Sequence, residues 1–232
     1  MKANLRAGNA GRIEMAFTRQ DLCGVLAVAL ILGLIVWPAL AGNPSRSHRV
    51  ICANNLRQVG QGFLLWAQEH SDYVPFDVEP AFGGTRLHPL GMNAWFQFSW
   101  ISNELISPKV LFCPSEASGQ PAADFSGSPS TGYVHPNFAN RATSYFLAHA
   151  GSTGPGAVLA GDRNIPASGQ TTCSRFRTTY YASTAWLSDL HGQQGNLLHA
   201  DGGVTQASNA RFDALINQER VNGSTFHLVL PR

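Results

Sequence analysis

A long uncharged stretch near the start of the chain constrains the fold more than any other feature. No charged side chain occurs between Asp21 and Arg46, and Leu22 to Ala41 reads LCGVLAVALILGLIVWPALA. As a helix, this run is long enough to cross a bilayer core of about 30 Å, where a chain must satisfy its own backbone hydrogen bonds. The sequence therefore predicts a transmembrane helix over residues 22–41. A cleaved secretory signal ending near ALAG is the alternative.

The charge pattern indicates how such a segment is oriented and what kind of chain follows it. Basic residues precede the apolar run, which favours a cytoplasmic N-terminus, although three arginines also follow it. The 232 residues have a formal charge of +2 and contain no block of like charges, so nothing indicates a nucleic-acid-binding surface. Once the apolar run is subtracted, the remaining length fits one globular domain, expected at residues 71–232.

The residues around the start of the apolar run resemble those of a known family. A short basic leader precedes Ala16-Phe17-Thr18-Arg19-Gln20-Asp21-Leu22, and this arrangement is similar to the type IV prepilin signal of pilins and type II secretion pseudopilins. The resemblance implies that a prepilin peptidase removes residues 1–16 by cutting between Ala16 and Phe17, and that the new amino terminus is N-methylated. Two residues depart from the family pattern, because Ala16 replaces its usual glycine and Asp21 its usual glutamate.

Asp21 has two interpretations. A carboxylate at the edge of the bilayer hydrocarbon is costly without a partner, and the resemblance implies pairing with the Phe17 amino group of a neighbouring subunit. Alternatively, Asp21 caps the helix within its own chain, where its charge favours the helix N-terminus. The sequence leaves both roles open.

The chain after the apolar run is expected to form an α+β domain. Apolar residues recur at spacings of three or four from Cys52 through Leu56, Val59 and Phe63 to Trp66, which predicts an amphipathic helix ending near residue 70. Such a stripe must be buried. We therefore expect a long N-terminal helix over residues 17–70, with its second half packed on a small antiparallel sheet, as in pilins.

Shorter signals predict the remaining elements. Strands are expected at residues 144–148, 157–160, 177–182 and 196–200, and residues 115–140 read as a long loop. Asp201 and Gly202 predict the two-residue turn of a hairpin, and Ser208 or Asn209 is expected to cap a short final helix. The aromatic cluster at residues 95–100 is interpreted as core, with a ligand-binding platform as the alternative.

Three further segments narrow the resemblance. They are CANNLRQVGQGFLLWAQEHSDYVPF at residues 52–76, LFCPS at residues 111–115, and His191 separated by nine residues from Asp201-Gly202. Together with the start of the chain, they are similar to a bacterial group of pseudopilin-like proteins described by a C-terminal H-X9-DG motif, here residues 191–202, and related to general secretion pathway protein G. Gly203 stands where many members have a second histidine.

The cysteines suggest one crosslink. Cys23 falls within the apolar run, whereas Cys52, Cys113 and Cys173 would face an oxidising compartment if the domain is exported. A disulfide between Cys52 and Cys113 is our hypothesis, because both lie in the segments that carry the family resemblance. One sequence does not determine the connectivity.

Donor side chains in the second half of the chain raise the question of a metal. The candidates are Asp162, Asn164, His191, His199 and Asp201. Some pseudopilins hold calcium through C-terminal loop oxygens, so calcium ranks ahead of zinc, with Asp162 and Asp201 as its ligands. Calcium needs six to eight oxygens and no D-x-D-x-D-G run occurs, so the expectation is no cofactor and two turn aspartates.

Catalysis is not expected. His191 and Asp201 could be read as an acid–base pair, but no G-x-S-x-G or H-E-x-x-H motif supplies a catalytic setting. The simpler expectation is that His191 hydrogen-bonds the hairpin turn beside Asp201 and steadies the end of the sheet.

The resemblance implies a function in assembly. The chain is expected to be a pilin-like or pseudopilin subunit of a type II secretion or type IV pilus-like apparatus. It would be anchored in the bacterial inner membrane with its domain in the periplasm. Its partners would be the membrane, a prepilin peptidase and other pilin-like subunits or copies of itself, without nucleic acid. The alternative is a membrane-tethered extracytoplasmic binding module that does not polymerise.

Overall fold

The chain divides into two compact units, Met1–Asn43 and Pro44–Arg232. The computed structural model describes residues 18–40, 44–149, 154, 156–166, 170–173, 177–180, 185–221 and 227–231. The amphipathic helix predicted from the sequence begins at Pro44 and so belongs to the second unit, called the head below. The sequence grouped this helix with the N-terminal one.

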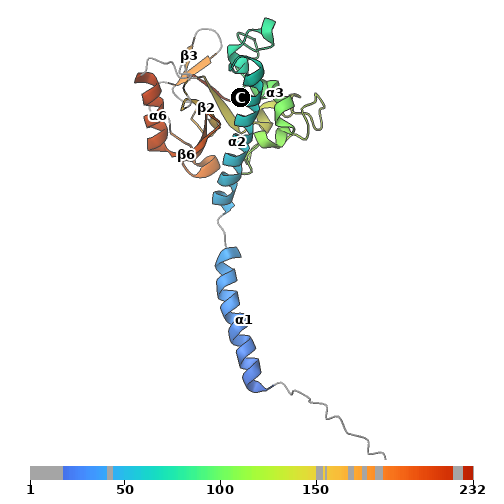
Figure 1. Ribbon diagram of the computed structural model, residues 1–232, viewed down its shortest axis with the longest axis vertical. Helices are drawn as coiled ribbons and strands as arrows, with labels where there is room; N and C mark the ends of the chain where they lie inside the picture. The colour runs from blue at the N-terminus through green and yellow to red at the C-terminus, as the bar shows by residue number, and fades with distance from the viewer. Residues whose placement is uncertain are drawn as a thin grey trace, which may run out of the picture. The chain divides into compact units, whose positions relative to one another are not determined.

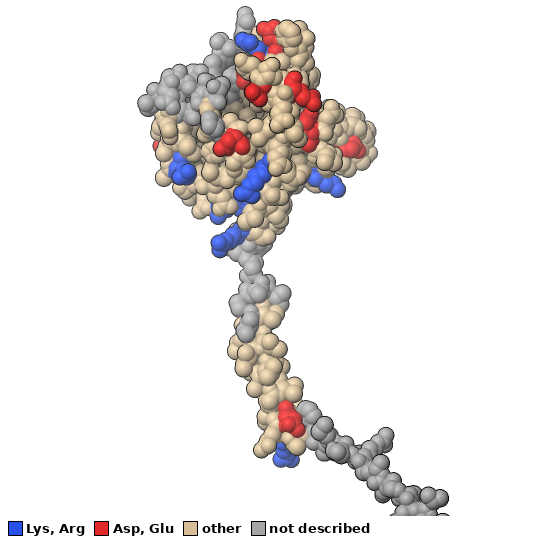
Figure 2. Space-filling model, viewed as in Figure 1, with Lys and Arg blue, Asp and Glu red and all other residues tan. Residues whose placement is uncertain are grey.

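The first unit contains helix α1, Arg19–Leu40, which is 22 residues long. The large apolar side chains that the structure describes on α1 are exposed; they are Leu22, Val25, Leu26, Val28, Leu30, Ile31, Leu32, Leu34 and Val36. In Figure 2 the described surface of α1 carries charge only at its first turn, where Arg19 and Asp21 lie. Within the part of the chain that the structure describes, none of the helices has the length and hydropathy that a membrane span requires.

The head is an α+β domain built around an antiparallel sheet. Its α-helices are α2 (Pro44–Glu69), α3 (Ala94–Trp100), α4 (Ser102–Leu105), α5 (Ser188–His191) and α6 (Asn209–Val221). Short 3-10 helices are η1 (Pro75–Asp77), η2 (Pro80–Phe82), η3 (Pro108–Leu111) and η4 (Ala139–Ala142). The strands are β1 (Tyr145–His149), β2 (Val158–Asp162), β3 (Gln170–Cys173), β4 (Arg177–Tyr180), β5 (Gln194–His199), β6 (Val204–Ser208) and β7 (His227–Val229).

The described strands form one seven-stranded sheet in the order β3-β4-β7-β1-β2-β5-β6. All of its neighbours pair antiparallel. The four predicted strands correspond to β1, β2, β4 and β5 with small shifts at their ends. Strands β3 and β7 were not predicted, and β6 was expected only as the second arm of the hairpin after Asp201-Gly202, because these short segments have little apolar alternation and are held in place by their neighbours in the sheet.

The predicted hairpin is formed by β5 and β6, with Leu198 opposite Val204. Its connection is longer than the two-residue turn that the Asp-Gly pair predicts, because residues 200–203 all lie between the strands. Gly202 has φ +81°, and the backbone N–H of Gly203 donates to Oδ1 of Asp201 at 2.8 Å. The aspartate thus shapes a wider turn through a local side-chain bond.

The sheet separates two apolar layers (Figure 1). One layer lies under α2 and the other under α6, on opposite sides of the sheet. Side chains alternate along β1, so that Tyr145 packs in the α2 layer and Phe146 in the α6 layer. The predicted stripe of α2 is buried in the first layer; its members Cys52, Leu56, Val59, Phe63 and Trp66 are at most 6% exposed.

The aromatic cluster at residues 95–100 belongs to this core. It forms helix α3, in which Phe98 is fully buried and lies 6.1 Å from Phe63 between ring centroids. Trp100 packs against the same layer and donates from Nε1 to the carbonyl of Gly83 at 2.7 Å. The interpretation of the cluster as core is therefore supported over a ligand platform.

Gly195 of β5 offers a test of how closely the α6 layer is packed. A Cβ at this position would lie 2.6 Å from the ring carbons of Trp186, whose ring stacks on Phe212 at 4.3 Å. Gly195→Ala is therefore expected to lower the free energy of unfolding by about 1–3 kcal/mol in urea denaturation. Gly127→Ala, where no atom lies within 4 Å, should change it by less than about 0.5 kcal/mol. Equal effects of both substitutions would contradict this packing.

Candidate functional site

The start of α1 carries the first group of candidate residues. The backbone N–H and the hydroxyl of Thr18 donate to Oδ2 of Asp21 at 2.9 and 2.7 Å, and the N–H of Asp21 donates to Oγ1 of Thr18 at 3.3 Å. This reciprocal pair is a capping box. Asp21 therefore caps its own helix, while its pairing with Phe17 of another subunit stays a prediction. Ala16 and Phe17 lie outside the described residues.

A disulfide joins Cys52 of α2 to Cys113, which follows η3. The two Cα atoms are 5.2 Å apart, and both cysteines are fully buried. The bond links positions separated by 61 residues and ties α2 to the loop segment beside it, which is the pairing that the resemblance favoured. The side chain of Cys173 lies outside those described, and Cys23 is an exposed free cysteine of α1.

His191 lies beside this disulfide. Its Nε2 is 3.5 Å from Sγ of Cys113, and its Nδ1 is 3.5 Å from Oγ of Ser115. His191 is the last residue of α5. The next residue, Gly192, caps the helix in the left-handed conformation with φ +64°. The expectation that His191 hydrogen-bonds the hairpin turn beside Asp201 is therefore wrong. The reason is that β5 follows His191, and six residues of extended strand at about 3.3 Å each carry the chain roughly 20 Å before the turn.

Asp162, the last residue of β2, completes this buried group. Its Oδ2 lies 3.5 Å from Nε2 of His191 and accepts hydrogen bonds from Asn196, at 2.7 Å from the backbone and 3.0 Å from the side chain. Its Oδ1 is buried without a hydrogen-bond partner. We refer to Cys52, Cys113, Asp162 and His191 as the buried cluster.

The proposed calcium ligands Asp162 and Asp201 are not brought together. In the β2–β5 ladder Gly161 lies opposite Leu197 and Val158 opposite His199, so Asp162 and the turn at Asp201 lie toward opposite ends of the ladder. Asp201 is exposed, whereas Asp162 is fully buried and belongs to strand β2, so the expectation that Asp162 is a turn residue is wrong. A calcium site made from this pair is thus excluded by the register.

The other two candidate donors, Asn164 and His199, form hydrogen bonds to adjacent loops and strands. Asn164 donates from Nδ2 to the carbonyls of Leu187 and Gln194 at 3.0 and 3.2 Å. His199 contacts the carbonyl of Gly156 at 2.9 Å and the hydroxyl of Thr205 at 2.8 Å. These bonds connect neighbouring strands and loops, so both residues have structural roles.

Burial dominates the electrostatics of the buried cluster. It raises the pKa of Asp162 to about 7, although hydrogen bonds from Asn196 and the charge of Arg49 act in the opposite direction. Burial lowers the pKa of His191 to about 4, and the charges of Arg49 and His48 add to this effect. Between pH 4 and 7 the contact therefore joins a neutral acid and a neutral imidazole instead of an ion pair.

The role of Asp162 was missed by sequence reasoning, which placed it in a turn. A signal was present, because it ends the apolar run Val158-Leu159-Ala160-Gly161-Asp162, where an aspartate in a buried strand needs internal partners. Which partners it finds depends on the alignment of β2 with β5.

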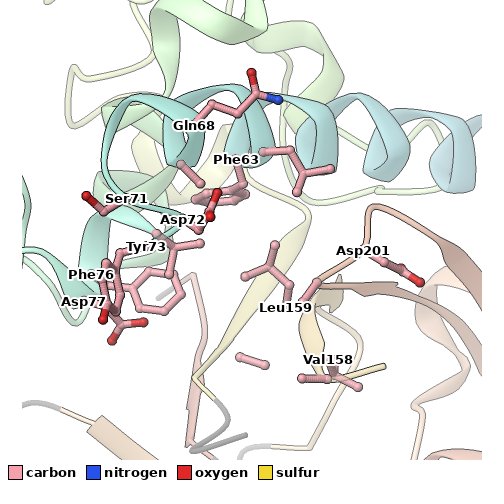
Figure 3. A pocket seen from close by; sticks show the side chains of 16 residues that line it. Phe63, Gln68, Ser71, Asp72, Tyr73, Phe76, Asp77, Val158, Leu159 and Asp201 are labelled. Carbon is pink, nitrogen blue, oxygen red and sulfur yellow. The ribbon is translucent and has the colours of Figure 1, made fainter. Parts of the chain in front are cut away.

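A separate cavity of about 640 Å³ opens beside the C-terminal end of α2. Its lining comprises Phe63, Leu64, Ala67, Gln68, Ser71, Asp72, Tyr73, Val74, Phe76, Asp77, Ala148, Ala157, Val158, Leu159, Ala200 and Asp201. Figure 3 shows Asp72 and Asp77 on one side of it and Asp201 on the other, around largely apolar walls. The apolar walls suit the apolar body of a ligand, and the three aspartates, called the acidic rim below, suit a cationic group on it.

The opposed pKa shifts predict how stability depends on pH. Because the pKa of Asp162 is raised in the folded chain, this group stabilises the fold at low pH. Its contribution to the free energy of unfolding is fully present below the ordinary pKa of 3.8 and is lost as pH rises through about 7. Because the pKa of His191 is lowered in the folded chain, its contribution to the free energy of unfolding is fully present above its ordinary pKa of 6.5 and is lost as pH falls through about 4. Between pH 4 and 6.5 the two therefore act against each other.

Asp162→Asn is expected to remove only the first contribution. The free energy of unfolding of this variant, minus that of the parent chain, should then increase with pH between 4 and 7, by up to about 1.4 kcal/mol per pH unit. Urea denaturation of the oxidised chains measures this difference. Asp201→Asn, which alters an exposed carboxylate, is the matched control for the loss of one acidic side chain. A pH-independent difference for Asp162→Asn would contradict the shift.

Comparison with known proteins gives no match to a family model, to a curated protein or to a solved structure. The motifs and contacts described above are therefore the basis on which a function is inferred.

Proposed function

We propose that this chain is a pilin-like subunit, anchored in the bacterial inner membrane by the apolar run at residues 22–41 of the sequence, and assembled side by side with other such subunits. A prepilin peptidase would remove residues 1–16, and the heads would form the periplasmic surface of a type II secretion or type IV pilus-like fibre. The observation that carries this proposal is α1 itself, an apolar helix with a capped, charged start and exposed apolar side chains.

The exposed side chains of α1 require a nonaqueous environment. Fully burying one large aliphatic side chain contributes about 1.5–3 kcal/mol, and α1 exposes such residues along most of its length. Lipid or neighbouring helices would remove them from water. The run Leu22–Ala41 contains no charge in the sequence, and its positions 35 and 37–41 lie outside the side chains that the structure describes.

Two glycines favour close packing between helices. A Cβ placed on Gly24 or on Gly33 would meet no atom within 4 Å. At about 100° per residue, positions nine apart lie on opposite sides of a helix. Each α1 therefore offers two separate points of close approach, as a subunit with different neighbours on its two sides would need.

Asp21 supplies a polar contact for the same assembly. Both capping bonds from Thr18 are accepted by Oδ2, which leaves Oδ1 available for a donor from another subunit. Under this proposal the donor is the amino group of Phe17 that processing creates. Capping and pairing are then compatible roles of one carboxylate.

The cavity favours a second function, that of a membrane-tethered binding module. Its apolar walls and acidic rim would accept a small amphiphilic cation, and the head would act without polymerising. In that case the chain keeps its leader and remains monomeric in cross-linking experiments. Processing therefore distinguishes the two functions.

Mass spectrometry of the chain recovered from its native membrane is the first test. If the proposal is correct, the mature chain begins at Phe17 and carries one added methyl group. The control is Phe17→Asp, which places a charge at the cleavage junction and should leave the leader attached. Recovery of parent chains that still begin at Met1 would contradict prepilin processing and favour the binding module.

Substitutions at the start of α1 separate pairing from capping. A hydrogen bond to a charged group contributes about 1.5–3 kcal/mol, so Asp21→Asn is expected to reduce cross-linked oligomers by roughly tenfold or more. Asp21→Glu retains the carboxylate and should preserve assembly. Thr18→Ala removes the partner in the capping box but keeps the charge, so it should affect assembly much less. Equal loss in Asp21→Asn and Thr18→Ala would assign Asp21 to capping alone.

A further inference from the structure

The buried cluster contains two titratable side chains that a structural disulfide does not require. A disulfide is uncharged and requires no titratable neighbours, yet an imidazole and a carboxylic acid lie next to this one with fully buried side chains. Oδ1 of Asp162 has no hydrogen-bond partner, and the contacts of the His191 ring to Cys113 and Ser115 are long, at 3.5 Å. Buried polar groups without good partners are costly and call for an explanation.

We infer that the buried cluster is a zinc site that alternates with the disulfide. When Cys52 and Cys113 are reduced, their two thiolates and Nε2 of His191 bind one zinc ion, and the carboxylate of Asp162 closes the coordination shell. This inference concerns the head alone and does not depend on assembly through α1.

The distances fit a site centred on Cys52, Cys113 and His191, and the carboxylate of Asp162, which already lies beside His191, has to move toward the two sulfurs to join it. Ligand atoms of Cys52, Cys113 and His191 all lie within 4.8 Å of one another. Nε2 of His191 lies 3.5 Å from Sγ of Cys113 and 3.5 Å from Oδ2 of Asp162. With zinc bonds of about 2.3 Å to sulfur and 2.0–2.1 Å to nitrogen or oxygen, the edges of a tetrahedral site are roughly 3.4–3.6 Å for these two atom pairs. Two zinc-bound sulfurs lie about 3.8 Å apart, so the metal and the disulfide exclude each other.

The donor set selects zinc over calcium. Two thiolates, an imidazole and one carboxylate suit a borderline-soft ion with four ligands, whereas calcium requires six to eight oxygens. The charges also balance, because the three anionic ligands are offset by the ion together with the nearby Arg49, whose charge acts on both Asp162 and His191.

The ligands come from four separate parts of the head. Cys52 lies on α2, Cys113 follows η3, Asp162 ends β2 and His191 ends α5. The N–H of Cys113 is fixed by the hydroxyl of Ser144 at 3.0 Å, so this ligand is held in place independently of its sulfur. A bound ion would therefore crosslink the same elements as the disulfide and extend the crosslink to the sheet.

The exchange between the two states is a balanced reaction. A dithiol transfers two electrons and two protons to the Cys52–Cys113 bond, which gives two cysteine thiols and the disulfide of the reductant. Zinc then displaces one proton from each of the two thiols as it binds, and a third from Asp162 wherever that carboxyl group is protonated. Oxidation by a disulfide-containing oxidant reverses the sequence and releases one zinc ion per chain.

Cobalt titration of the reduced full chain in detergent tests this inference. The chain is reduced anaerobically with excess dithiol, the reductant is removed, and Co²⁺ is added as a spectroscopic substitute for zinc. One equivalent should produce thiolate-to-cobalt charge transfer and the intense visible bands of four-coordinate cobalt. Zinc should abolish both, and native mass spectrometry should then find one zinc per chain.

Variants assign the ligands individually. His191→Ala and Asp162→Asn should each weaken cobalt binding by at least about tenfold. The matched controls are His135→Ala and Asp201→Asn, which lie outside the buried cluster and should bind as the parent chain does. Because His191→Ala and Asp162→Asn keep both cysteines, circular dichroism of their oxidised forms shows whether each variant folds.

Several outcomes would overturn the inference. One is a reduced chain that keeps its circular dichroism spectrum yet shows no thiolate-to-cobalt absorption. Another is binding that His191→Ala leaves unchanged. A reduced chain that unfolds and is not refolded by one equivalent of zinc would also overturn it, because the ion should restore the lost crosslink.

Discussion

The head depends on the burial of one face of α2 against the sheet. The apolar stripe from Cys52 to Trp66 enters the same layer as the inward-facing residues of β1, β2 and β5. Leu56, Val59 and Phe63 are essentially inaccessible to water, and each contributes about 1.5–3 kcal/mol through this burial. Because α2 also contacts α4, α5 and η3, it is the element around which the loop-rich half of the domain is organised.

The H-X9-DG spacing acquires a physical meaning in this fold. The residues between the histidine and the Asp-Gly pair include all of β5, so His191 precedes the strand and the Asp-Gly turn follows it. One end leads into the buried cluster beside Cys113, and the other forms the exposed hairpin turn next to the cavity. The motif therefore does not unite its residues in one site, and its two halves serve different parts of the domain.

The two units of the chain differ in whether their apolar side chains are buried. The head buries its own apolar surface in two layers on either side of the sheet. α1 keeps its apolar side chains exposed and closes its N-terminal hydrogen bonds with its own capping box. A helix of this kind is stable in lipid or among copies of itself, which is the physical basis for proposing assembly.

The sequence by itself determined the local features. The spacing of apolar residues identified α2, short runs with strand-forming residues located β1, β2, β4 and β5, and Asp201-Gly202 marked the hairpin, because these signals depend on neighbours along the chain. Only the tertiary structure decided the sheet order, the division at Asn43 and the grouping of Asp162 and His191 with the two cysteines. Those contacts join residues that are far apart in the sequence; Cys113 and His191, for example, are separated by 78 positions. They follow from the strand register and from the burial that selects this register. No pattern within a short window of sequence contains that information.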